Sequence, residues 1–436
     1  MQLGAEAFGA DEPYFSWYFQ TVYRPGAECC AGGTPTGAAH VKADVFGGGC
    51  MKETIHMVLR VLTPVFVGCG QKLLKKEYIY IPNENHVYVP DRDRFFSWLQ
   101  ERNLVDAYTD FILSSDNSLY QWLLSQKASK EEIRGLAAYT AHGGDRTING
   151  KPIRLDDIHS MVKGPGGKPY LPGSSIKGAM RTALLNKMVT GKKPCPFPEE
   201  AFRKGVQEMD ARVKSGKEPH GRASKSLFRR EAGNIEEGQF HKLRLINQKG
   251  KEIPSYNAVC SAMRGLSVSD SLPVDASCLT LCQKLDVGPS GGISSRVPMM
   301  RECLKPGTEL HTALTLDDCF LREAGMDRQF LVEAIQEFYA LQNRQFVAKF
   351  HGFEHEAEER GCVLYLGGGC GFPSKTILQS LYGDAALSCT AELLTFLFPD
   401  GYHETDVAAG GSPHMLKCTK WEDRLVPMGK CEVLFP

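Results

Sequence analysis

The chain has 436 residues and equal numbers of basic and acidic residues, 51 of each, so its formal net charge is zero. A content of 42% hydrophobic and 23% charged residues is ordinary for a globular protein and argues against a disordered chain. No apolar run is as long as a membrane span, and the N-terminus is acidic and aromatic rather than a signal sequence. We therefore expect a soluble cytoplasmic protein.

The fifteen cysteines fit free thiols in such a protein better than disulfides. Cys278 and Cys282, with Cys260 and Cys303 nearby, are the best metal candidates. No second close pair completes a four-ligand pattern, so we predict neither a metal site nor a cofactor.

Residues 1–50 contain two glycine clusters and show no sustained hydrophobic period. We interpret them as an N-terminal extension, which could come from an over-called translation start. The competing interpretation is an ordered element, because the aromatic residues between 15 and 19 could pack.

A clear strand pattern follows Met51, in which alternate apolar residues face one side: Ile55, Met57, Leu59 and Val61. A hairpin is predicted over 77–81 and 86–89. Helices should begin at Asp91, near residue 106 and at Ser129, which forms a capping box with Glu132. Residues 142–168 resemble a long loop.

The segment 169–185 predicts a loop that leads into a basic helix. Ser174 could cap the first turn, and Lys177 and Arg181 lie one turn apart. Free N–H groups at a helix N-terminus, beside two cations, suit a phosphate. Seven Lys or Arg and no acidic residue occur from 158 to 198, which favours a polyanion site. The alternative is an ordinary solvated helix face.

Residues 191–255 are polar and resemble an insertion, in which basic and aromatic residues near Arg229 could stack on bases. A mobile surface excursion is the alternative. Strands are then expected over 265–269, 277–283, 309–316, 362–366 and 431–435, with a long helix over 327–346.

The stretch 367–376 is rich in glycine and ends in Ser374-Lys375-Thr376. It misses a nucleotide-binding P-loop by one residue, and Pro373 lacks an N–H for phosphate. Glycines let a backbone approach another chain closely, so RNA contact beside Lys375 is our preferred interpretation. Ser374 could cap the next helix. The alternative is a tight strand-to-helix connection with Lys375 in water.

Five segments together resemble the RAMP superfamily of RNA-binding proteins, and within it the fifth subunit of type III-A CRISPR (Csm) complexes. They are residues 169–185, 265–271, 300–307, 366–376 and 412–429. The resemblance runs from about residue 51 to the C-terminus. It implies an α/β, ferredoxin-like or RRM-type core over 51–436, with insertions at about 91–165 and 191–255.

The resemblance also implies a function, that of a non-enzymatic RNA-binding subunit. Such a subunit holds the 3′ part of the CRISPR RNA (crRNA), caps the complex and promotes maturation of the crRNA 3′ end. Its partners would be crRNA, other Csm subunits and host trimming nucleases, with target RNA as a further candidate and no membrane. The predicted RNA-binding residues are Gly173, Ser174, Ser175, Lys177, Arg181, Gly367, Gly368, Gly369, Gly371 and Lys375.

The alternative function is a RAMP endoribonuclease that processes precursor crRNA. Asp156, Asp157 and His159 are the only candidates near the basic helix, and adjacent aspartates in a polar loop are usually solvated. Asp270 fits a strand-end carboxylate that makes local hydrogen bonds. We therefore predict no catalytic residue.

Overall fold

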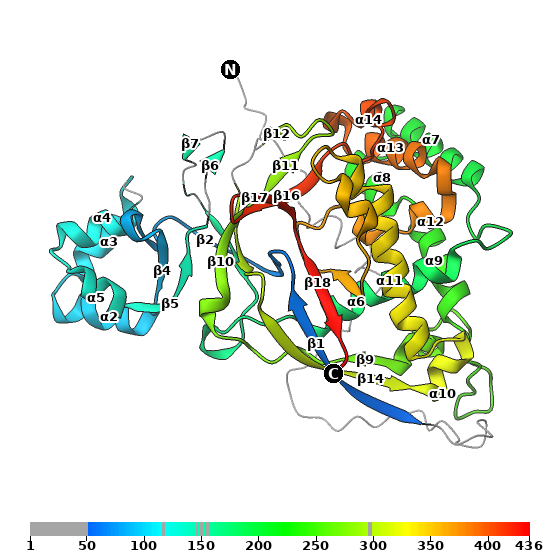
Figure 1. Ribbon diagram of the computed structural model, residues 1–436, viewed down its shortest axis with the longest axis horizontal. Coiled ribbons are helices and arrows are strands. Elements are labelled where there is room, and N and C mark those ends of the chain that lie inside the picture. The colour runs from blue at the N-terminus through cyan, green and yellow to red at the C-terminus, as the bar shows by residue number, and fades with distance from the viewer. Residues whose placement is uncertain are drawn as a thin grey trace.

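A five-stranded antiparallel sheet lies at the centre of the molecule (Figure 1). The computed structural model describes residues 51–436 apart from 116–117, 145–146, 149–150, 153–154, 156 and 295–298, so the predicted extension 1–50 and Asp156 lie outside it. The strand order is β15-β18-β1-β14-β9. The strands are β1 (Lys52–Val61), β9 (Leu266–Val268), β14 (Glu309–Asp317), β15 (Val363–Tyr365) and β18 (Lys430–Leu434).

Four of these strands and two helices form a ferredoxin-like unit. Strands β1 and β9 both run antiparallel to β14, so they are parallel to each other, with α6 (Gly173–Val189) in their connection. Strands β14 and β18 flank β1 in the same way, with α11 (Arg328–Gln345) between them in the chain. These are the two split β-α-β units of the fold, which confirms the prediction. Strand β15 extends the sheet beyond β18.

The core forms where the sequence pattern of β1 places it. Its apolar side chains are buried and belong to the same cluster as buried residues of α6 and α11: Ile55, Met57, Leu59 and Val61. His56 and Arg60 alternate with them and are exposed. The strand therefore buries the predicted face completely, and on the other face Val58 is buried as well.

A seven-stranded sheet has the order β2-β8-β13-β10-β5-β4-β3. Its strands are β2 (Gly68–Leu73), β3 (Ile79–Ile81), β4 (His86–Pro90), β5 (Ala137–His142), β8 (Ile158–Met161), β10 (Leu279–Gln283) and β13 (Met300–Leu304). A four-stranded sheet contains β11 (Leu285–Val287), β12 (Ile293–Ser294), β16 (Leu416–Trp421) and β17 (Arg424–Pro427). A two-stranded sheet contains β6 (Thr147–Ile148) and β7 (Lys151–Pro152).

Four short helices form a group of their own at the left of Figure 1, around a separate apolar cluster. They are α2 (Arg92–Glu101), α3 (Val105–Leu113), α4 (Leu119–Ser125) and α5 (Lys130–Gly135). The Asp91 cap and the capping box of Ser129 and Glu132 are confirmed.

The predicted insertion at 191–255 contains three helices, α7 (Glu199–Lys214), α8 (His220–Ser226) and α9 (Arg229–Phe240). Phe228 stacks on Phe202, with ring centroids 4.7 Å apart, in a cluster shared with α13 (Ala386–Leu397). This aromatic side chain is therefore used for packing rather than for stacking on bases.

The remaining helices are α10 (Asp318–Leu321), α12 (Leu378–Tyr382) and α14 (Asp406–Ala409). None of the helices in the described residues is long and apolar enough to cross a membrane. The boundaries of the two predicted insertions stay a prediction.

Candidate RNA-binding site

The N-terminus of α6 is occupied by a carboxylate of the protein itself. The helix begins at Gly173 with Pro172 at the N-cap and no side chain capping it, so the prediction of a Ser174 cap is wrong. Asp270, which follows β9, accepts a hydrogen bond from the Gly173 N–H at 2.8 Å. The positive end of the helix dipole favours this carboxylate, which takes up one of the N–H groups that the predicted phosphate would use.

Gly173 is needed for packing between α6 and the sheet. A Cβ atom at this position would lie 2.2 Å from the Val268 carbonyl oxygen in β9, so only glycine fits. Ser174 is exposed and Ser175 is half-buried. Of these three predicted residues, Ser174 is the one whose side chain is most open to a ligand.

Lys177 makes internal contacts. Its ammonium group donates hydrogen bonds to the carbonyl oxygens of Met263 and Leu266, at 3.0 and 2.6 Å. Burial, and then the nearby charge of Arg181, lower the pKa of the Lys177 ammonium. In this conformation the side chain holds the backbone that leads into β9.

Arg181 forms an ion pair with Glu236 of α9, and its guanidinium lies over the ring of Phe240, 5.9 Å from the centroid. The Glu236 side chain is only 8% exposed. Burial raises the pKa of the Glu236 carboxyl, and the charge of Arg181 opposes this effect. The arginine is therefore the counterion of a buried acid.

Three other cations of the basic run have partners as well, whereas Lys168 and Lys193 are exposed and form no ion pair among the described residues. Lys163 pairs with Glu302, Lys187 pairs with Glu333 and Glu337, and Lys192 donates to Gln239. The acidic residues that are missing between 158 and 198 are thus supplied by other elements. Most of the local excess of positive charge in the sequence is therefore paired after folding, and only Lys168 and Lys193 of this run stay exposed without an ion pair or a side-chain hydrogen bond in the described structure.

The glycine-rich loop follows β15 and packs tightly against the linker between β1 and β2. Gly367 has φ +77°, and a Cβ atom there would lie 2.0 Å from the Phe66 carbonyl oxygen. The Gly368 N–H donates to the same oxygen at 2.6 Å. Gly369 has φ +94°, and a Cβ atom added there would lie only 2.8 Å from an Arg301 nitrogen. These glycines allow close approach to the protein's own backbone and side chains.

The end of the loop leaves one cation available. Ser374 donates a hydrogen bond to the Gly371 carbonyl and does not cap α12, whose N-cap is Ile377, so the predicted cap is wrong. Lys375 is half-buried; its backbone N–H donates to the Phe372 carbonyl at 3.0 Å, but its ammonium group forms no ion pair or hydrogen bond within the described part of the chain. Of the predicted cations, Lys375 alone is free to bind phosphate without losing an internal contact in the described structure.

The ten predicted residues form two groups, which begin at opposite edges of the central sheet. Gly173 lies against β9, and Gly367 follows β15, and these two strands are the edges of the sheet. The structure therefore does not bring the ten residues together into one pocket. An RNA strand that touches both groups must cross from one edge to the other.

Residues 244–259 form an exposed loop that the sequence analysis did not single out. Its ends are closed by a 3.1 Å hydrogen bond from the Leu243 N–H to the Cys260 carbonyl. Arg244, Lys249 and Lys251 are exposed and have no ion pair in the described residues, and Tyr256 is 73% exposed. Interleaved basic and aromatic residues are a sequence signal for binding single-stranded nucleic acid.

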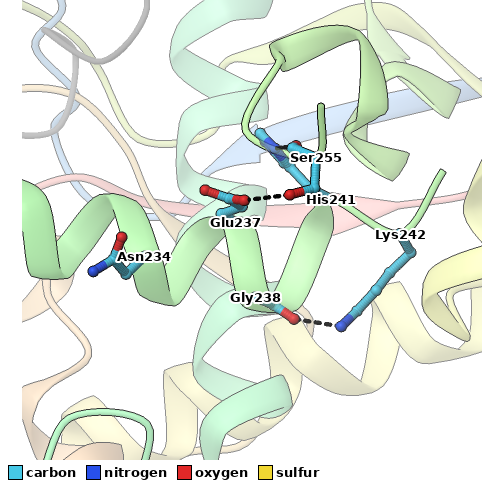
Figure 2. A pocket seen from close by; sticks show the side chains of 6 residues that line it. All are labelled: Asn234, Glu237, Gly238, His241, Lys242 and Ser255. Atoms are coloured by element: carbon cyan, nitrogen blue, oxygen red, sulfur yellow. Dashed lines mark hydrogen bonds between the residues drawn. The ribbon is translucent and has the colours of Figure 1, made fainter. Parts of the chain in front are cut away.

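A shallow pocket lies at the base of this loop (Figure 2). Ser255 donates to Glu237 at 2.7 Å, and the carbonyl oxygen of Ser255 contacts the His241 ring nitrogen at 2.7 Å. Lys242 donates to the Gly238 carbonyl. Since these polar groups contact one another, the pocket anchors the loop rather than offering a ligand site.

Two of the residues considered for catalysis, Asp157 and His159, lie within the described structure. Asp157 and His159 are half-buried, and His159 in β8 is in register with Arg301 of β13. Neither belongs to a group of three potential metal ligands among the described residues.

Comparison with known proteins identifies the family. The family model of the RAMP superfamily matches residues 58–361. The chain belongs to the RAMP superfamily. It is 26% identical over 403 residues to a protein named Csm5 from Mycobacterium tuberculosis, which covers 87% of this chain and 97% of the relative. A Csm5 protein from Streptococcus thermophilus is 26% identical over 337 residues, or 76% and 82% of the two chains.

Two solved structures have a similar fold. One is a chain of a Csm–crRNA–target RNA ternary complex of a type III-A CRISPR-Cas system, with a TM-score of 0.55, 19% identity and coverage of 88% and 100%. The other is the crystal structure of T. onnurineus Csm5, with a TM-score of 0.51, 22% identity and coverage of 86% and 99%. Both support the RAMP α/β fold.

Proposed function

We propose that this RAMP protein is the Csm5-type subunit of a type III-A CRISPR effector complex. It binds crRNA and other Csm subunits, holds the 3′ part of the crRNA and caps the complex. It also promotes maturation of the crRNA 3′ end by host trimming nucleases, and it has no nuclease activity of its own. The observation that carries the proposal is the similarity to Csm5 proteins over up to 97% of their length.

The proposed binding is directed to the RNA backbone, because guide sequences vary and a fixed protein cannot read them all. Lys375 and the neighbouring loop glycines contact phosphate and ribose at one edge of the sheet. Ser174 and the exposed loop 244–259 contact RNA at the other edge, where Tyr256 offers a ring on which a base can stack.

Lys177 and Arg181 stay in the proposed site, with a role that their contacts suggest. Lys177 holds the backbone after loop 244–259, and Arg181 holds α9 before it. The two cations therefore position this loop from both ends. A direct contact with phosphate would require each cation to exchange its internal partner for the RNA.

The zero net charge supports shared binding. RNA affinity comes mainly from neutralised phosphates, and in this chain the acidic residues balance the basic residues in number. We expect modest affinity for RNA in isolation, and stronger binding when neighbouring subunits add their contacts.

The deciding experiment purifies the protein from its native cells and sequences the RNA that accompanies it. Discrete crRNAs with a shared 5′ tag and stepped 3′ ends, together with other Csm subunits, are the expected result. A protein without RNA and without Csm partners would refute the proposal. Metal-free cleavage of repeat RNA, lost on changing His159 to Ala, would establish the endoribonuclease function instead.

A further inference from the structure

A group of polar side chains lies outside the proposed RNA-binding surfaces, in the segment that joins α13 to β16. His403 lies in a short 3-10 turn, Asp406 begins α14, and His414 follows the Ser412–Pro413 bond. The Asp406 side chain is fully buried, with 0% exposure. It accepts hydrogen bonds from Ser412 at 2.7 Å, from His403 at 3.0 Å and from His414.

The buried carboxylate has no permanent cation beside it. Within the described ranges, no lysine or arginine forms an ion pair with Asp406, and its two charged-group partners are imidazoles. Burying a carboxylate is costly unless a positive charge compensates it. The hydrogen bonds from His403, Ser412 and His414 stabilise the carboxylate, and a cation bound at the same place would compensate its charge directly.

The three side chains offer a fitting set of metal ligands. One ligand atom from each residue lies within 4.8 Å of the others. In a tetrahedral zinc site with bonds of about 2.0–2.1 Å, neighbouring ligand atoms are about 3.3 Å apart, so only small side-chain shifts are needed. Two imidazoles and a carboxylate are a common zinc-binding set, in which a water takes the fourth position.

The site is also accessible to an ion, and its three residues lie within one short segment of the chain. The His403 and His414 side chains keep 12% and 20% of their surface exposed, which leaves a path for a small ion. The sequence alone pointed to cysteines as the best metal candidates. Cys278 and Cys282 do not join any group of three ligands in the described residues, whereas the His-x2-Asp-x7-His spacing does.

We propose that His403, Asp406 and His414 bind a zinc ion. The ion compensates the buried charge of Asp406 and ties together both ends of the segment 403–414. It thereby fixes the approach to β16, which pairs with β11 and β17. Its role is structural and independent of RNA binding.

The test uses the full chain, with any polyhistidine tag removed, loaded with zinc and then desalted. Elemental analysis should find about one zinc per chain. The melting temperature should rise with added zinc and fall again with EDTA, because an ion that binds only the folded state stabilises it. A folded chain that retains no zinc and ignores both additions would overturn the proposal and leave a hydrogen-bonded cluster.

Two variants locate the ion. Asp406→Asn keeps the size of the side chain, and His414→Gln keeps a hydrogen-bond donor, but each removes a good zinc ligand. Either change should weaken zinc affinity by about 100-fold or more. The control is His351→Ala, because the pair of His351 and Glu354 is 3.2 Å apart and mostly exposed. Equal zinc retention in His414→Gln and in the control would place the ion elsewhere and refute the site.

Discussion

The first turns of α6 and the glycine-rich loop after β15 contain the same kinds of residue, glycine and serine followed by lysine. In α6 both cations contact other parts of the protein. Lys177 donates hydrogen bonds to two carbonyl oxygens, and Arg181 forms an ion pair with a buried carboxylate. In the loop, the glycines pack against the protein, and the Lys375 ammonium group has no hydrogen-bond or ion-pair partner among the described residues. Positive charge in a segment therefore predicts ligand binding only after the acids and carbonyls of the whole fold are counted.

The largest effect is expected from Gly367→Ala, which tests whether the loop glycines serve the fold. The added Cβ would lie 2.0 Å from the Phe66 oxygen at φ +77°, so unfolding should become easier by about 3 kcal/mol or more. Gly371→Ala is the matched control: φ is +80°, but the nearest atom is 3.7 Å away, so about 1–2 kcal/mol is expected. Urea unfolding measures both, and equal losses would show that the close contact is unimportant.

Arg181→Ala tests whether the cation serves the fold or the RNA. Removing the arginine leaves the Glu236 carboxylate buried and unpaired, which should lower the free energy of unfolding by about 2–3 kcal/mol. This loss is smaller than for a fully buried pair, because the Arg181 side chain is 27% exposed. Adding Glu236→Gln should restore much of the stability. Lys204→Ala, which removes an exposed pair with Glu208, should cost under about 0.5 kcal/mol. Unchanged stability with weaker RNA binding would make Arg181 a phosphate ligand.

Lys375→Ala should have the opposite effects, with unchanged stability and weaker RNA binding. Stability should stay within about 0.5 kcal/mol because no internal contact is lost. Binding to single-stranded RNA should weaken equally for different sequences, and the slope of log affinity against log salt should become shallower by about 0.7. Lys204→Ala is again the control. An unchanged slope in a salt titration would remove Lys375 from the proposed site.

The smallest effect is a dependence on pH. The raised pKa of Glu236 means that between its usual value of 4.5 and the raised value only the folded chain keeps the proton. Wild-type protein should therefore lose stability relative to Glu236→Gln as pH rises through this window, by about 1 kcal/mol or less. Unfolding curves of both proteins across the window measure the difference, and parallel curves would contradict the inferred burial.

Local periodicity predicted much of the fold, because the residues that decide an element lie close together in the sequence. The strand at 51–61, the helix at 327–346 and the Ser129 capping box depend on contacts within a few residues. The Ser174 cap failed because the distant Asp270 carboxylate accepts from the first N–H group of the helix, and the Ser374 cap failed because that hydroxyl donates to the nearby Gly371 carbonyl. The order of the strands came from the family resemblance.

The site was harder to predict, because its decisive partners are far away in the sequence. Arg181 and Glu236 are 55 residues apart, and Lys177 contacts Leu266 across 89 residues. No local window shows that these charges and carbonyls will meet. The exposed loop 244–259 could have been found from its basic residues and Tyr256, whereas the edge-to-edge separation of the two groups depends on the topology of the sheet.

The strand order has a consequence for synthesis of the protein. Strand β18, formed by residues 430–434, fills the gap between β15 and β1 inside the central sheet. A ribosome makes β1 long before β18, so β1 and β15 each wait with an unpaired edge while the chain grows. Until residues 430–434 are made, the central sheet therefore exposes a strand edge on which another chain can pair.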